Sequence, residues 1–170
     1  MDKDILFRER QRFSQWWVWA ILIGLNGILI FGFFWQVIGG KAFGNNPLSN
    51  SELAIAVGIS AVVTILFANF RLETKIASDG ICVRLFPIHI KFKRYPWSDI
   101  SKCFVRKYSA MSEYGGWGYR LGGAGKGRAL NISGDMGLQL EFVNKKKLLI
   151  GTKKPEELRK VLEKIEAVKP

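Results

Sequence analysis

The sequence predicts an α-helical transmembrane hairpin of two spans, followed by a mainly β domain that ends in one amphipathic helix. Two uncharged apolar runs lie within the first 70 of the 170 residues. The following hundred residues contain short segments in which apolar and polar side chains alternate, as in half-buried strands. Near the C-terminus the apolar spacing changes from that of a strand to that of a helix.

The first apolar run covers residues 16–38 and the second covers residues 53–70. The first has 23 uncharged residues and the second has 18, and a membrane span needs about 20. A cleaved signal peptide would have a shorter apolar region and a small-residue cleavage site after it, and neither feature is present. We therefore expect two transmembrane helices.

The flanking charges predict how these spans are oriented. Residues 39–52 are rich in Gly, Asn, Ser and Pro and form a polar turn. Basic residues lie on the other side of each span, namely Arg8, Arg10 and Arg12 before the first and Arg71 and Lys75 after the second. By the positive-inside rule, we expect both termini to lie in the cytoplasm. The chain is then a multi-pass protein of the plasma or inner membrane.

The domain after the spans carries the charge of the chain, with 21 Lys and Arg against 10 Asp and Glu from residue 71 onward. About seven antiparallel strands are predicted by alternation, at 71–78, 81–86, 88–93, 102–108, 128–132, 137–143 and 147–150. A C-terminal helix is predicted at 155–168, where Leu158, Val161, Leu162 and Ile165 form one stripe.

Together these elements divide the chain into five parts. We expect a cytosolic segment at 1–15, spans at 16–38 and 53–70, an extracytoplasmic loop at 39–52 and a cytosolic domain at 71–170.

Three motifs carry a family resemblance. The sequence YPWSDI at 95–100 resembles the W-x-[DE]-I step of bacterial pleckstrin-homology-like (PH-like) domains, and EYGGWGYR at 113–120 resembles a loop of small bacterial membrane proteins of this type. Residues 148–158 resemble their junction between last strand and helix. The chain thus resembles bacterial two-span proteins with a C-terminal PH-like domain. The resemblance implies strands curled into a partial barrel capped by the helix, and it brings no catalytic residues.

The glycine-rich stretch 115–127 contains no phosphate-binding motif. Gly125 and Lys126 are followed by Gly127 where a P-loop needs Ser or Thr, and the G-x-G-x-x-G pattern also fails. One interpretation is a connection between strands. The other is a loop that binds a ligand or partner, with Trp117, Tyr119 and Arg120 as its contacts.

The basic clusters also allow two interpretations. Lys91, Lys93 and Arg94 lie in or beside a predicted strand and are candidate contacts to anionic headgroups, because the inner leaflet attracts nearby cations. The alternative is a solvated face. Nucleic acid is a disfavoured partner because no recognition motif accompanies the charge.

The sequence predicts no enzyme, metal site or cofactor, since His89 is the only histidine and no Cys/His cluster is present. Two functions remain. The first is a non-enzymatic, membrane-anchored binding or scaffold module that acts through protein–protein interaction or self-association. The alternative is a binder or sensor of anionic lipid headgroups or another anion at the inner leaflet.

Overall fold

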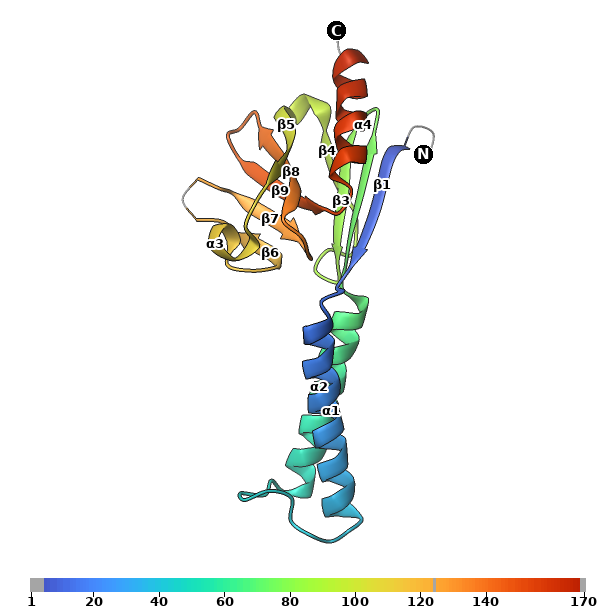
Figure 1. Ribbon diagram of the computed structural model, residues 1–170, viewed down its shortest axis with the longest axis vertical. Coiled ribbons are helices and arrows are strands. Elements are labelled where there is room, and N and C mark those ends of the chain that lie inside the picture. The colour runs from blue at the N-terminus through green and yellow to red at the C-terminus, as the bar shows by residue number, and fades with distance from the viewer. Residues whose placement is uncertain (1–4, 124, 169–170) are drawn as a thin grey trace. The chain divides into compact units, whose positions relative to one another are not determined.

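The computed structural model describes residues 5–123 and 125–168, with side chains up to residue 165. The chain divides into two compact units (Figure 1). One unit is helical and spans residues 14–69, and the other is mainly β and combines the segment before Ser14 with the chain from Phe70 onward.

The helical unit consists of α1 (Trp16–Val37) and α2 (Asn50–Asn69), both long and apolar enough to cross a membrane. Most of the residues in their most apolar windows are not buried, with buried shares of 17% and 11%. Between the helices, Asn26 Nδ2 donates to Thr64 Oγ1 at 2.8 Å. At the start of α2, the Ser49 backbone N–H donates to Glu52 at 2.8 Å and Ser49 Oγ accepts from the Glu52 backbone N–H, which forms a capping box.

Among the described residues, the β unit contains nine strands in two sheets, where the sequence predicts about seven antiparallel strands. Sheet A has the order β1-β2-β3-β4, formed by β1 (Ile5–Arg12), β2 (Arg71–Ala77), β3 (Gly80–Phe86) and β4 (Lys93–Pro96). Sheet B has the order β5-β8-β9-β7-β6, formed by β5 (Ile100–Lys107), β6 (Gly118–Leu121), β7 (Arg128–Asn131), β8 (Met136–Phe142) and β9 (Lys147–Thr152). The pairing of β7 with β9 is parallel, so the prediction of a purely antiparallel arrangement is wrong.

Two strands lie where the sequence predicts none. Strand β1 comes from the N-terminal segment, and β6 lies inside the glycine-rich stretch. Alternation in β1 is concealed because its buried side carries Glu9 and Gln11 beside Phe7. Strand β6 is only four residues long and therefore too short to show a period.

The strand predicted at 88–93 is wrong. Strand β3 ends at Phe86, and the His89 backbone N–H donates to the Leu85 carbonyl at 2.7 Å, so the chain turns there. Strand β4 begins only at Lys93. The alternation that suggested a strand instead leaves Ile88 and Ile90 exposed on a loop.

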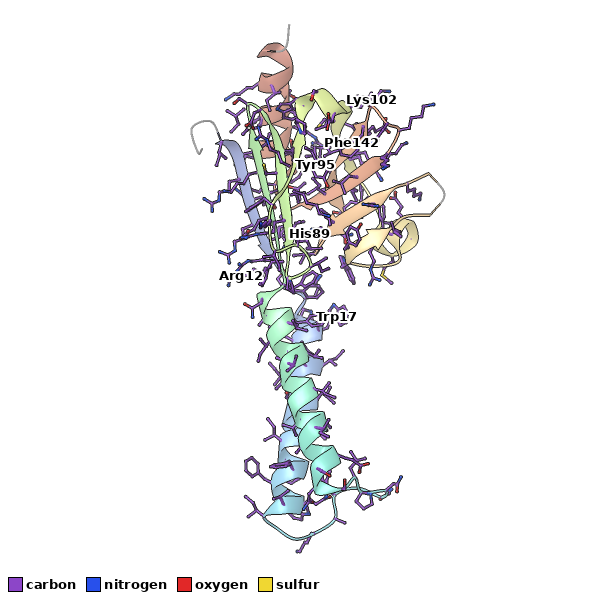
Figure 2. The ribbon with its side chains drawn as sticks, turned by 180° about the vertical axis from the view of Figure 1, so that it is seen from behind. Arg12, Trp17, His89, Tyr95, Lys102 and Phe142 are labelled. Carbon is purple, nitrogen blue, oxygen red and sulfur yellow. The ribbon has the colours of Figure 1, made fainter. Side chains whose placement is uncertain are left out.

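The main core contains side chains of both sheets and the predicted stripe of α4 (Pro155–Val168). The rings of Tyr95 from sheet A and Phe142 from sheet B lie 5.3 Å apart (Figure 2). On the other side of sheet B, the short helix α3 (Ala110–Tyr114) covers a second cluster with Ala129 and Leu149. Sheet B is therefore covered on both faces.

Candidate anion-binding face

The outer side of sheet A is strongly basic because successive side chains of a strand point to opposite faces. In β1 the residues Phe7, Glu9 and Gln11 are buried, whereas Arg8, Arg10 and Arg12 are exposed. The antiparallel register places these arginines beside outward residues of β2, with Arg12 opposite Arg71, Arg10 opposite Glu73 and Arg8 opposite Lys75. On the next strand, Arg84 lies opposite Glu73.

We call this surface the arginine face and define it by Arg8, Arg10, Arg12, Arg71, Lys75 and Arg84 around Glu73. It is assembled from strands on both sides of the helical hairpin, because β1 precedes α1 and β2 follows α2. In the sequence, the spacing of Arg8, Arg10 and Arg12 at every second residue is the pattern that could have indicated this face. Only the register with β2 and β3 makes these residues neighbours of Arg84.

Three arginines converge on the single carboxylate of Glu73. Arg84 Nε donates to Glu73 Oε2 at 2.9 Å, and the Nε atoms of Arg10 and Arg71 lie 3.4 and 3.6 Å from Glu73 Oε1. Each guanidinium carries five N–H donors, so one carboxylate cannot satisfy all three. Within the described part of the chain, Arg71 Nε is a buried donor without a hydrogen-bond acceptor. The cluster therefore has donors and positive charge in excess.

Two aromatic rings border this face. The guanidinium of Arg71 lies 4.7 Å from the ring centre of Phe86, and that of Arg84 lies 4.5 Å from the ring of Phe92. Lys75 Nζ lies 5.1 Å from the same Phe92 ring. These cation–π contacts hold the basic side chains in place, and Glu73 is the carboxylate shared by Arg10, Arg71 and Arg84.

The sequence-predicted cations are distributed differently from this cluster. Lys91 lies in the loop before β4 and Lys93 begins that strand, and both are exposed. Arg94 forms an ion pair with Asp79, in the turn that joins β2 and β3 at the other end of the sheet from Arg71. Lys91 and Lys93 are thus exposed cations, whereas Arg94 already has an anionic partner.

The three side chains proposed for the glycine-rich loop do not form one surface. Tyr119 packs against the main core, and its ring lies 5.7 Å from that of His89. Trp117 packs on the opposite side of sheet B against the α3 cluster. Arg120 is exposed, and its Nε donates to the Trp117 carbonyl at 2.9 Å.

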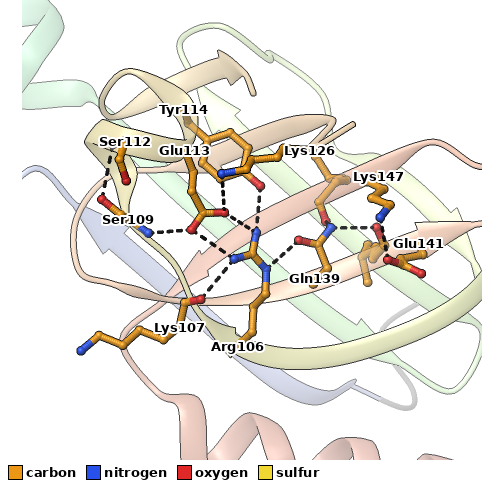
Figure 3. A network of polar contacts seen from close by, with 12 residues as sticks. Arg106, Lys107, Ser109, Ser112, Glu113, Tyr114, Lys126, Gln139, Glu141 and Lys147 are labelled. Atoms are coloured by element: carbon orange, nitrogen blue, oxygen red, sulfur yellow. Dashed lines mark hydrogen bonds and ion pairs between the residues drawn. The ribbon is translucent and has the colours of Figure 1, made fainter. Parts of the chain in front are cut away.

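A polar network beneath α3 explains part of the 113–120 motif (Figure 3). Arg106 donates to the Glu113 carboxylate at 3.0 and 3.2 Å and to the Tyr114 hydroxyl at 3.1 Å. The Arg106 hydrogen bond lowers the pKa of Glu113, and burial raises the pKa of Tyr114. Gln139 on β8 accepts a further bond from Arg106 at 3.0 Å. These contacts attach α3 to sheet B. The donors of Arg106 bond to acceptors within the network itself.

A hollow of about 310 Å³ lies between β5 and α4. Its wall includes Trp97, Ile100, Cys103, Leu162 and Ile165. The lining is mixed, with Ser101 and Lys102 beside the apolar side chains, and it is separate from the arginine face.

Among the described residues, no group of three or more His, Cys, Asp or Glu side chains is arranged to hold a metal ion. Neither the protein-family models nor the curated proteins contain a match to this sequence. The inference of function therefore depends on the geometry of the arginine face and on the two apolar helices.

Proposed function

We propose that this protein is a non-enzymatic binding module of the plasma or inner membrane, anchored by α1 and α2, with a PH-like domain that holds anionic phosphate headgroups on its arginine face. One observation carries this proposal: the arginine face is built largely from β1, the strand immediately before α1, and β2, the strand immediately after α2. The two sheets followed by a C-terminal helix support the PH-like assignment.

Chain connectivity supports a membrane surface as the source of the ligand. Three residues separate Arg12 from the first residue of α1, and one residue separates Arg71 from the end of α2. At a maximum of about 3.6 Å per residue, these cations lie within about 15 Å of the helix ends. Anionic headgroups attract cations over about one Debye length, which is close to 8 Å at physiological salt.

The pairing of β1 with β2 also supports a common side for both termini. Strands that share seven register pairs must lie on one side of the bilayer. With the basic residues that flank the helices, the positive-inside rule makes that side the cytoplasm.

The test uses the full chain in nanodiscs of phosphatidylcholine, with or without phosphatidylglycerol. We expect anionic lipid to raise the thermal midpoint of the β unit, since a ligand that binds only the folded state stabilises it. Arg10→Gln combined with Arg84→Gln should abolish most of this increase. Lys145→Gln combined with Lys160→Gln removes the same charge from exposed positions outside the arginine face and should preserve it.

A third condition distinguishes a lipid headgroup from a free anion. Inorganic phosphate added to neutral nanodiscs should reproduce the stabilisation if the face binds a soluble anion. If neither anionic lipid nor phosphate raises the midpoint, or if the control pair reduces it as much as the arginine pair does, the arginine face is not the ligand site.

Self-association is a second candidate, favoured by the edge of sheet B. Strand β6 pairs only with β7 among the described strands, and Leu121 at its end is exposed. A free strand edge can pair with a second copy. Chemical cross-linking of the full chain in detergent should then give a dimer that Leu121→Lys weakens. A strictly monomeric chain would contradict this candidate.

A further inference from the structure

The loop between β3 and β4, residues 87–92, exposes two isoleucines at one end of sheet A. Ile88 is 50% exposed and Ile90 is 76% exposed. Phe86 at the end of β3 and Phe92 at the end of the loop contact basic residues of the arginine face, whereas the two isoleucines between them are exposed. The loop thus presents two exposed apolar side chains beside a basic surface.

The loop has a defined conformation. The His89 N–H bonds to the Leu85 carbonyl at 2.7 Å, and an Arg84 guanidinium N–H reaches the Ile90 carbonyl at 3.4 Å. The His89 ring packs against Tyr119 of sheet B, and burial, followed by the charge of Lys93, lowers the pKa of His89. The loop is therefore fixed to both sheets while Ile88 and Ile90 remain outside.

The register of sheet A identifies which end of the domain carries this loop. Phe86, the last residue before it, pairs with Arg71, and Arg71 pairs with Arg12. These are the two residues of the sheet that are nearest in sequence to α2 and α1. Figure 2 shows Arg12 and His89 near one end of the β unit and Lys102 near the other. The exposed isoleucines thus extend from the row that continues into the two apolar helices.

From this juxtaposition we infer that Ile88 and Ile90 insert into the boundary between headgroups and acyl chains, as a third membrane contact beside α1 and α2. The occupant is phospholipid, because only residues 13–15 connect Arg12 to α1 and only Phe70 connects α2 to Arg71, and because the cations Lys91 and Lys93 come directly after the isoleucines in the chain. Two insertion points, helices and loop, restrict rotation of the domain about its tethers. The orientation of the arginine face toward the bilayer is then fixed.

This inference rests on the membrane anchoring of the proposed function and not on its anion site. The two can fail separately, because apolar insertion should occur in neutral phosphatidylcholine whereas the arginine face requires anionic lipid.

The test places a fluorophore on the loop of the full chain in nanodiscs. In a background with Cys82→Ala and Cys103→Ala, Ile90→Cys is labelled with an environment-sensitive dye. Val143→Cys is the matched control, because Val143 is 68% exposed and its backbone N–H bonds to Asp99, beyond the far end of β4. Quenching is measured with iodide in water and with nitroxide-labelled lipids.

We expect the dye at position 90 to be quenched by lipid nitroxides in both neutral and anionic nanodiscs, with iodide quenching several-fold lower than at position 143. Equal iodide quenching at the two positions, with no lipid quenching at position 90, would overturn the inference. Thermal midpoints of both labelled variants within a few degrees of the unlabelled background verify that the fold is retained. If lipid quenching at position 90 appears only in anionic nanodiscs, the contact is electrostatic and insertion of the isoleucines is excluded.

Discussion

The carboxylate of Glu9 in the first strand accepts a hydrogen bond from the Thr152 hydroxyl at 2.6 Å, although 143 residues separate them. The same carboxylate accepts the backbone N–H of Lys153 at 2.7 Å, just before α4 begins. Thr152 Oγ1 in turn accepts the Lys154 N–H at 3.0 Å. The N-terminal strand thus supplies a negative charge at the start of the C-terminal helix, where the helix dipole favours it.

Replacing Glu9 should destabilise the β unit. Glu9→Ala leaves the Thr152 hydroxyl and the Lys153 N–H without their acceptor, which costs about 1–3 kcal/mol for buried donors. The exposed Glu163 on α4 is the control, and Glu163→Ala should change stability by about 0.5 kcal/mol or less. Thermal unfolding of the full chain in detergent, followed by tryptophan fluorescence, measures both. Equal midpoints for the two variants would contradict a structural role of Glu9.

Neighbouring residues of β1 should respond very differently to truncation. Phe7 is 2% exposed and belongs to the main core, whereas Leu6 is 47% exposed on the outer side. Phe7→Ala should therefore cost about 3–5 kcal/mol, the usual penalty for a large cavity in a core. Leu6→Ala should cost about 0.5 kcal/mol or less. The same unfolding assay compares them, and similar losses would mean that the N-terminal segment is not packed as a strand.

Acid should weaken the attachment of α3 through Glu113. The Arg106 hydrogen bond holds the pKa of Glu113 below its ordinary value of 4.5 in the folded protein. A lowered folded pKa stabilises the fold fully above the unfolded value, and this stabilisation is lost as the pH falls through the folded pKa. Glu113→Gln should lower the free energy of unfolding at neutral pH by about 1–3 kcal/mol, which lowers the thermal midpoint, and should flatten the decline of the midpoint below about pH 4.5. The thermal midpoint is measured as a function of pH. A curve for Glu113→Gln that runs parallel to that of the unsubstituted chain would refute this role. Glu163→Gln is the control.

The pairing of β1 with β2 makes a prediction about topology in cells. In a background without Cys82 and Cys103, single cysteines replace Leu6, Asn45 or Ser112, which are all exposed. A membrane-impermeant maleimide should label Asn45→Cys in intact cells, but the other two only after lysis. Labelling of Leu6→Cys without labelling of Ser112→Cys would separate the two strands across the bilayer and exclude their pairing.

Some elements follow from local pattern. The apolar runs became α1 and α2, two helices long and apolar enough to cross a membrane. The hairpin between β2 and β3 turns at Ser78 and Asp79, because Gly80 already belongs to β3 and pairs with Ala77, with a φ of +151° beside the Tyr95 carbonyl. The stripe of Leu158, Val161, Leu162 and Ile165 became the buried side of α4. Each of these signals lies within one short segment.

Other features depend on contacts between distant segments. Alternation alone could not assign β1, since its buried Glu9 and Gln11 are polar and become acceptable only when Thr152 and Gly151 bond to them. Alternation also led to the wrong prediction of a strand at 88–93. There, Ile88 and Ile90 alternate with polar residues but lie exposed on a loop. The partial barrel stays a prediction, because the described strands form two separate sheets. The PH-like assignment also stays a prediction, because no family model matches the sequence.

The sequence by itself determined two apolar helices, a basic β-rich region and a C-terminal amphipathic helix, because composition and short-range periodicity encode these features. Only the tertiary structure decided that Arg10 joins Arg71 and Arg84 around Glu73 and that Arg8 and Arg12 lie on the same face. The reason is that strand register is a long-range property. It is set here by the burial of Phe7 and by the Glu9 and Gln11 contacts to the end of β9, far along the chain.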